Sequence, residues 1–322
     1  MIIQAGMRTD IPAFYSEWFM NRIREGYVLV RNPYNPDQIT RYELDPKVVD
    51  CIAFCTKNPT PMLPHLQELQ TFRQFWFVTL TPYGKDIEPN VPNKHNIVES
   101  FKELSRAVGI AKSANSGDAV QWRYDPIFIN EKYSVEQHIK SFEVMASKLA
   151  GYTHTCVISF IDLYSKVKKN FPEAREVSSE ERTVLAKAFV EIGKQFDIQI
   201  KTCAEGKDLE QYGVICEGCS TAAVIEKALD LSSQGLCLQP PKKNFARSEC
   251  QCIIGCDVGA YNTCPHLCRY CYANYSKELV LANRQLHDPK SPMIIGNIRP
   301  GESIHQAEQK SWIKGLRNDA FL

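Results

Sequence analysis

Short apolar runs that each end abruptly in polar residues constrain the fold of this 322-residue chain more than any other feature. Apolar runs of this length, without alternation, are typical of strands buried on both faces of a parallel sheet. They span residues 1–6, 48–55, 75–80, 119–122, 156–161 and 198–201. Segments with helical spacing lie at 11–25, 91–108, 135–149, 178–196 and 221–231. This alternation predicts an α/β fold, either a TIM-like (β/α) barrel, full or partial, or an open α/β sheet.

The residues at the start of two of these helices carry capping signals. Asp10 is suited to cap the first helix, and Pro12 lies in its first turn. Ser178 and Glu181 have the spacing of a capping box. These signals mark where the helices begin and agree with the predicted alternation.

The polar residues that end the apolar runs are the candidate functional residues of the barrel. In a (β/α) barrel the active site forms at the carboxyl ends of the strands. The polar residues at these ends are Arg8, Asp10, Lys57, Asn58, Thr81, Arg123, Asp125, Asp162 and Glu205. Any one of them is explained equally well as a solvated loop residue or a helix cap. We expect Arg123, Asp125, Lys57 and Asp162 to bind or orient a polar substrate.

Near the C-terminus, Cys264, Cys268 and Cys271 form a C-x3-C-x2-C motif, with Tyr270 directly before the last cysteine. A tight loop of this spacing can bring three thiolates to one metal centre. Structural zinc sites and ordinary iron–sulfur cubanes have four protein ligands. Three cysteines would leave one iron of a cubane open to a small molecule.

The motif resembles the cluster-binding motif of the radical S-adenosylmethionine (radical SAM) enzymes. The resemblance implies that Cys264, Cys268 and Cys271 hold a [4Fe–4S] cluster and that S-adenosylmethionine (SAM) binds its fourth iron. It also implies that one electron cleaves SAM to a 5′-deoxyadenosyl radical, which acts on a substrate that the sequence does not identify. Tyr270 is expected near the adenine, and a ferredoxin or flavodoxin is expected as the electron donor.

The position of the motif differs from that in radical SAM enzymes, which usually carry it near the start of the barrel. The first and last strands of a barrel are neighbours, so a rotated chain order preserves the arrangement in space. We therefore expect residues 251–258 to form or feed a strand beside the first strand. In this permuted arrangement Gln4, Gly6 and Arg8 are candidate SAM contacts, and Glu205 is a further candidate for cofactor binding.

Several segments are similar to an uncharacterised family, domain of unknown function 1848. They are residues 8–13, 56–59, 122–126 and 262–274. The tail is also distantly similar to spore photoproduct lyase. Residues 239–243, Gln-Pro-Pro-Lys-Lys, interrupt the alternation of strand and helix. We therefore predict a barrel domain in 1–240, and in 241–322 a cysteine-rich cluster-binding segment with a tail that packs on the barrel.

Seven other cysteines form two groups, a candidate second centre and a group expected in the core. Cys250 and Cys252, joined by Cys203 and Cys219, are candidates for a second metal centre such as an auxiliary iron–sulfur cluster. Buried structural thiols are the alternative, since free cysteine is among the most buried residue types. The apolar surroundings of Cys51, Cys55 and Cys156 place these three in the core.

Two other functions are compatible with the C-terminal motif. One is a zinc-dependent hydrolase or lyase, with the zinc site completed by His266, Cys256 or another cysteine. The other is a non-catalytic electron-transfer protein whose cluster has protein ligands only. His266 itself is expected at the surface of the loop rather than as a ligand.

The net charge and the composition limit which kinds of partner are expected. The net charge of +1 does not support binding to nucleic acid or to an anionic membrane. No apolar run approaches the roughly 18 residues of a membrane span, and the first residues lack the features of a signal peptide. We expect a cytoplasmic protein. Thirteen cysteines in a reducing compartment indicate metal ligands or redox chemistry rather than disulfides.

Overall fold

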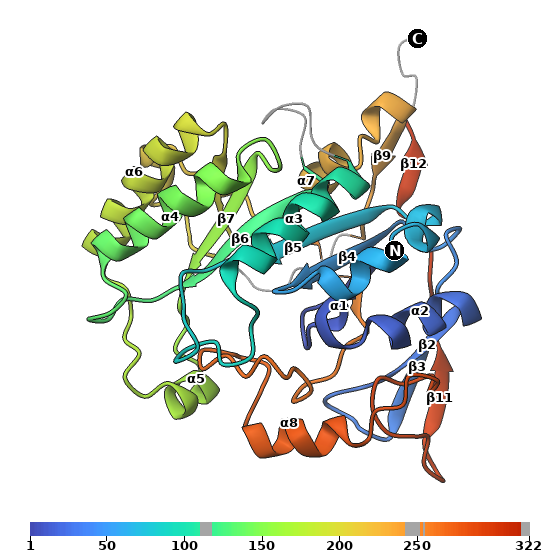
Figure 1. Ribbon diagram of the computed structural model, residues 1–322. Helices are drawn as coiled ribbons and strands as arrows, with labels where there is room; N and C mark the ends of the chain where they lie inside the picture. The colour runs from blue at the N-terminus through green and yellow to red at the C-terminus, as the bar shows by residue number, and fades with distance from the viewer. Residues whose placement is uncertain (110–117, 242–251, 254, 317–322) are drawn as a thin grey trace.

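The computed structural model describes residues 1–109, 118–241, 252–253 and 255–316. Their centre is a seven-stranded sheet with the order β10-β1-β4-β5-β6-β7-β8. Figure 1 shows its middle strands, β4 to β7, side by side. Every neighbouring pair in this sheet is parallel. The predicted α/β class is therefore confirmed.

Each of the six apolar runs named above forms one strand of this sheet, and β10 adds the seventh strand. The strands are β1 (Ile2–Ala5), β4 (Cys51–Thr56), β5 (Gln74–Thr79), β6 (Val120–Ile127), β7 (Thr155–Phe160), β8 (Gln199–Thr202) and β10 (Cys256–Asp257). The last of these lies within residues 251–258, and Cys256 pairs with Ile3 while Asp257 pairs with Gln4. The expected neighbourhood of a late strand and the first strand is confirmed.

The two ends of this strand order are β10 and β8. A closed barrel requires the two edge strands to pair with each other. In the part of the chain that the structure describes, no pairing joins them. The described residues thus form a parallel α/β sheet, and the full barrel, predicted beside a partial barrel and an open sheet, is not seen among them.

The helices follow the predicted segments closely. They are α1 (Ile11–Phe14), α2 (Ser16–Glu25), α3 (Lys94–Val108), α4 (Val135–Leu149), α5 (Ser165–Asn170), α6 (Ser179–Gln195), α7 (Ala222–Ala228) and α8 (Lys277–Arg284). The one helix predicted over 11–25 is divided at Tyr15, whose φ of −133° is not helical. The capping box of Ser178 and Glu181 is confirmed, and Asp10 caps α1 by accepting a hydrogen bond from the Ala13 amide at 3.0 Å.

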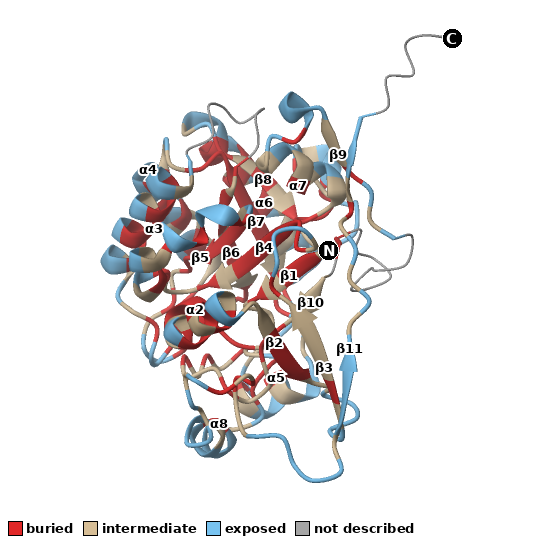
Figure 2. Ribbon diagram, turned by 90° about the vertical axis from the view of Figure 1, so that its right-hand side faces the viewer, coloured by how far each residue is buried: buried red, intermediate tan, exposed pale blue. Residues whose placement is uncertain are grey.

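Alternate side chains of the strands point into two different apolar cores, as the two-residue period of a strand requires. Ile52 and Phe54 of β4 belong to the larger core, which includes residues of α2, α3, α4 and α6. Cys51 and Ala53 point to the other face, into a smaller core with Ile225 of α7. Figure 2 shows the strands as a mostly buried layer inside the molecule. The sheet is therefore covered on both faces, which explains its continuous apolar runs.

Two small sheets lie beside the main one. Their strands are β2 (Tyr27–Arg31), β3 (Gln38–Glu43), β9 (Leu236–Leu238), β11 (Ser303–Gln306) and β12 (Ile313–Gly315). Short 3-10 helices cover 60–65, 68–71, 210–212 and 232–234. In the tail, β11 runs parallel to β3 and β12 runs antiparallel to β9, so the last described residues pack on earlier parts of the chain.

A close backbone approach at the carboxyl end of β1 requires glycine. Gly6 has a φ of +154°, and a Cβ atom there would lie 2.1 Å from the carbonyl oxygen of Cys55. No side chain fits this space unless the backbones of β1 and β4 separate. Gly6, a candidate SAM contact, thus has a structural role that explains its presence.

We predict that Gly6→Ala lowers the free energy of unfolding by at least about 2 kcal/mol, because the added carbon overlaps backbone that cannot move aside cheaply. Urea unfolding under reducing conditions measures this. Gly315→Ala is the control, since its Cβ would meet nothing within 4 Å. Equal stability of the two variants would contradict the close approach.

Candidate functional site

The predicted site residues gather around one cavity of about 340 Å³ at the carboxyl ends of the parallel strands. From the strand ends come Gln4, Gly6, Arg8, Lys57, Arg123, Asp125, Asp162 and Glu205. From the cysteine-rich segments come Cys203, Cys219, Cys252, Cys264, Cys268, Tyr270 and Cys271. Cys250 lies outside the described residues. Parallel strands end at the same edge of a sheet, which is why residues so far apart in sequence meet here.

The loop that carries the triad is fixed by hydrogen bonds from other elements. The Tyr15 hydroxyl donates to the Thr263 carbonyl at 2.6 Å, and the Asn90 side-chain amide donates to the Pro265 carbonyl at 2.7 Å. The Arg269 amide donates to the Ile87 carbonyl at 3.0 Å. These bonds come from the end of α1 and from the loop after β5, so the loop is held from two sides.

Burial raises the pKa of all three triad thiols, Cys264, Cys268 and Cys271. The Ala273 amide donates to the Cys271 sulfur at 3.3 Å, which favours the thiolate and partly opposes burial. A bound metal takes thiolates and displaces their protons. In these buried surroundings the thiols are protonated without a metal. The positive charge of a bound metal would stabilise them as thiolate ligands.

Asp10 joins the triad loop to the ends of β1 and β4. Beyond its capping bond, its second carboxylate oxygen accepts hydrogen bonds from the Lys57 amide at 2.7 Å and from His266 Nε2 at 2.9 Å. His266 is buried and packs edge-to-face on Phe14, so the expectation of a surface position is wrong. The carboxylate of Asp10 explains this burial because it provides a polar partner for the ring inside the protein.

Glu88 is a central residue of the site that the sequence did not single out. Its carboxylate is 1 % exposed and accepts hydrogen bonds from Thr81 at 2.8 Å and from the Tyr270 hydroxyl. Lys57 and Lys94 form salt bridges with it at 2.9 and 2.7 Å. Burial opposes the charge, but the two ammonium groups outweigh it and hold the Glu88 pKa at about 2. Glu88 lies in the loop after β5, where no motif or period marks it.

Arg123 and Asp125 form an ion pair of 2.6 Å at the end of β6. Ser159 of β7 donates a hydrogen bond to the same carboxylate, so the pair is braced by the neighbouring strand. The buried Nε of Arg123 has no hydrogen-bond partner among the described residues. This guanidinium is thus oriented by protein on one side and retains a donor beside the cavity.

Arg8 and Glu205, both candidates for cofactor binding, have protein partners. The Arg8 amide donates to the Asp257 carboxylate at 2.9 Å, and its guanidinium donates to the Asp257 carbonyl. Arg8 therefore fastens the end of β1 to β10. Glu205 accepts a hydrogen bond from the Phe160 amide at 2.9 Å and pairs with Arg182 at 3.0 Å.

Asp162 and Gln4 complete the predicted set. The Asp162 carboxylate accepts a hydrogen bond from the Tyr164 hydroxyl at 2.9 Å. The main-chain carbonyl of Gln4 accepts a hydrogen bond from the Val258 amide at 3.0 Å, which extends the contact of β1 with β10. Both residues line the cavity.

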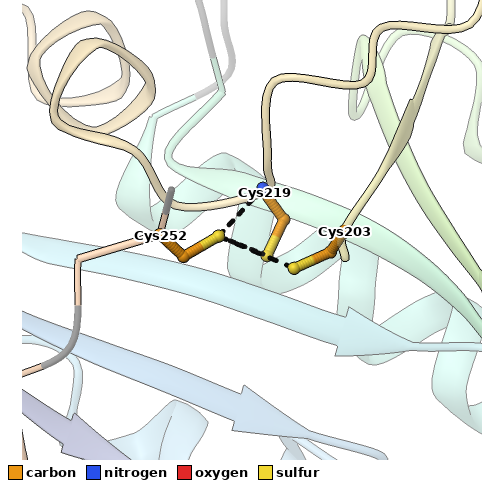
Figure 3. Close-up of side chains that lie close together, drawn as sticks. All are labelled: Cys203, Cys219 and Cys252. Atoms are coloured by element: carbon orange, nitrogen blue, oxygen red, sulfur yellow. Dashed lines mark hydrogen bonds between the residues drawn. The ribbon is translucent and has the colours of Figure 1, made fainter. Parts of the chain in front are cut away.

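A second cysteine group, Cys203, Cys219 and Cys252, also lines the cavity (Figure 3). The Cys252 sulfur lies 3.6 Å from that of Cys203 and 3.5 Å from that of Cys219. Within the described ranges, this is the one group of three potential ligands whose atoms all lie within 4.8 Å of one another. Three of the four residues predicted for a second centre are therefore close enough to hold a metal.

Burial raises the pKa of Glu205 from 4.5 to about 7, and the nearby Asp162 and Asp125 add to this effect, while the Phe160 amide and Arg182 oppose it. A raised pKa means that the folded protein binds this proton more tightly than the unfolded chain. The stabilisation is therefore complete below about pH 4.5 and is lost as the pH rises through about 7.

We predict that Glu205→Gln removes this pH dependence. Between about pH 5.5 and about pH 8 the wild type should lose about 2 kcal/mol of unfolding free energy that the variant retains. Urea unfolding of both proteins at the two pH values measures the difference. The exposed Glu210→Gln is the control, and parallel pH profiles for wild type and Glu205→Gln would refute the raised pKa.

In the described ranges, no helix combines the length and the apolar character that a membrane-spanning helix needs.

Comparison with known proteins identifies the chain at the level of a family. No curated protein and no solved structure matches the chain. One protein family, described as "Domain of unknown function (DUF1848)", matches residues 2–273. Because this match spans most of its length, the chain belongs to the DUF1848 family.

Proposed function

We propose that this protein is a radical SAM enzyme with a permuted chain order. The observation that carries the proposal is the parallel pairing of β10 with β1, because it brings a C-terminal cysteine triad to the cavity at the carboxyl ends of the sheet. When bound, a [4Fe–4S] cluster with SAM at its open iron supplies one electron that cleaves SAM to methionine and a 5′-deoxyadenosyl radical. The electron would come from a reduced ferredoxin or flavodoxin.

The residues around the triad fit such a group. Cys264, Cys268 and Cys271 would be the cluster ligands, and all three line the cavity. Two further cavity residues have buried polar atoms that lack a partner in the described part of the chain, namely Nδ1 of His266 and Oδ1 of Asn274. Buried polar atoms are normally paired, so unpaired ones beside a cavity support a bound polar group.

The spacing of sulfurs argues against zinc at the triad. A zinc–sulfur bond of about 2.3 Å in tetrahedral geometry places thiolates about 3.8 Å apart. Among the described residues, the triad is not a group whose potential ligand atoms all lie within 4.8 Å of one another. In a cubane each thiolate binds a different iron, so a wider spread of sulfurs is expected. The cavity, with its charged lining, favours an enzyme over a protein that only relays electrons.

The positive charge beside the triad comes from Lys57. Lys57 is held by Glu88, and its charge opposes the burial that raises the pKa of Cys268 and of Cys271. In the proposed enzyme Lys57 would offset negative charge of the thiolates and the cluster. The same Glu88 fixes the Tyr270 hydroxyl, so the ring of Tyr270 has one orientation beside the triad, as a surface for the adenine requires.

The proposed substrate site lies at the ends of β6 and β7. Arg123 has a buried donor without a protein partner, and Asp125 and Ser159 hold the guanidinium in place. A guanidinium oriented in this way suits a carboxylate, phosphate or carbonyl oxygen of the substrate. Asp162 would supply an acceptor for a donor group at the same mouth. A reactive carbon radical needs a site from which water is excluded, and the cavity lining would have to provide this once cofactor and substrate are bound.

We predict that anaerobically reconstituted protein releases 5′-deoxyadenosine from SAM after reduction by dithionite. Cys268→Ala should lower this release to the background of cluster-free protein, because one iron loses its ligand. Cys237→Ser is the matched control, since Cys237 lies in β9 and is not among the residues that line the cavity. Chromatographic quantification of 5′-deoxyadenosine, with iron content measured on the same samples, checks this.

Two results would refute the proposal. One is wild-type protein with a complete cluster that leaves SAM intact, which would indicate an electron carrier. The other is release of 5′-deoxyadenosine that persists in Cys268→Ala, which would remove the triad from the reaction. Zinc in place of iron at the triad would instead support a hydrolase or lyase.

A further inference from the structure

Cys203, Cys219 and Cys252 form a compact sulfur group that the proposed reaction does not use. The sulfurs of Cys203 and Cys219 lie 3.6 and 3.5 Å from that of Cys252. Figure 3 shows the three side chains pointing toward one another. Zinc–sulfur bonds of about 2.3 Å at the tetrahedral angle place thiolates about 3.8 Å apart. The observed spacing is thus close to that of three ligands sharing one ion, and too tight for thiolates on separate irons of a cubane.

The main chain around the group is arranged to accept a thiolate. The amides of Cys219 and Ser220 donate to the Cys252 sulfur at 3.2 and 3.3 Å. They belong to a turn in which Gly218 has a φ of +102°, and a Cβ atom on Gly218 would lie 3.2 Å from that sulfur. Amide donors stabilise the charged form of a sulfur and orient it, as supporting groups around metal ligands do.

The three cysteines lie next to elements at both edges of the main sheet. Cys203 directly follows β8, which is one edge of the main sheet, and Cys252 lies shortly before β10, which is the other edge. Cys219 precedes α7, which covers the smaller core. One ion held by all three would connect the two edge strands, which no described strand pairing joins. Metal-binding free energy at such a place contributes to folding.

We propose that Cys203, Cys219 and Cys252 supply three of the four ligands of one tetrahedral zinc ion, separate from the triad, that fastens the two edges of the sheet. Soft thiolate ligands at tetrahedral spacing select zinc among the common divalent ions. The inference does not depend on the proposed reaction, because it requires neither the cluster nor SAM. It also departs from the predicted auxiliary iron–sulfur cluster.

The neighbouring Cys216 shows that the proposed ligands do not follow a simple sequence motif. Cys216 and Cys219 have the C-x2-C spacing of a zinc hook. However, the Cys216 sulfur contacts the Val214 carbonyl at 3.8 Å and is not part of the compact group. The structure thus assigns Cys219 as a ligand and leaves out Cys216, in agreement with the predicted set, which did not include Cys216.

Elemental analysis of the purified, full-length protein tests the proposal. We expect about one zinc per chain in the wild type, in keeping with a mononuclear site. Cys268→Ala should retain this zinc, which separates the centre from the triad. Cys219→Ser should lose it, and Cys216→Ser, the matched control in the same loop, should keep it.

A second measurement uses the wild-type chain and does not depend on folding of a variant. Replacement of zinc by cobalt should give the strong thiolate-to-metal absorption and tetrahedral ligand-field bands of a sulfur-rich site. Protein without stoichiometric zinc would overturn the proposal, as would zinc that Cys216→Ser loses and Cys219→Ser keeps. Four additional irons with sulfide would overturn it in favour of a second cluster.

Discussion

The pairing of β10 with β1 is the contact on which the rest of the structure depends. It is short, with Cys256 beside Ile3 and Asp257 beside Gln4. A Cβ atom on Gly255 would lie 1.7 Å from the Ile2 carbonyl oxygen, so this strand can approach only because that residue is glycine. The Arg8–Asp257 contacts secure the same junction at the cavity. Without this pairing, the triad would not reach the carboxyl ends of the sheet.

Buried charge then determines how the cavity is built. Asp10 accepts hydrogen bonds from the Lys57 amide and His266, and Glu88 accepts from Lys57 and Tyr270. Burying charges is costly unless each has a partner, and removal of one partner usually costs several kcal/mol. These carboxylates therefore tie the strand ends and the triad loop into one unit. Arg123 lines the same cavity and pairs with Asp125, and its buried Nε has no partner among the described residues.

The sequence predicted correctly those features for which a local pattern has a single physical explanation. Continuous apolar runs located the strands of the main sheet, and the shift of the triad to the C-terminus implied a late strand beside β1. The sequence was silent on Glu88 and on the partners of His266, since a loop residue gains its role only through distant contacts. The β2–β3 hairpin was missed although Val28, Leu29 and Val30 of β2 form a buried apolar run, because β3 is mostly polar and half-buried. Cys203, Cys219 and Cys252 were predicted together with Cys250 as a second centre, but the close spacing of their sulfurs came only from the structure.

The central claim is that the cluster at the triad has one iron without a protein ligand, and that SAM occupies it. Electron–nuclear double resonance of the reduced cluster tests this most directly, using SAM isotopically labelled in its methionine amino and carboxylate groups. The account predicts hyperfine coupling between the cluster and the labelled atoms, lost in Cys268→Ala. An intact cluster whose resonance is unchanged by SAM and shows no such coupling would contradict it.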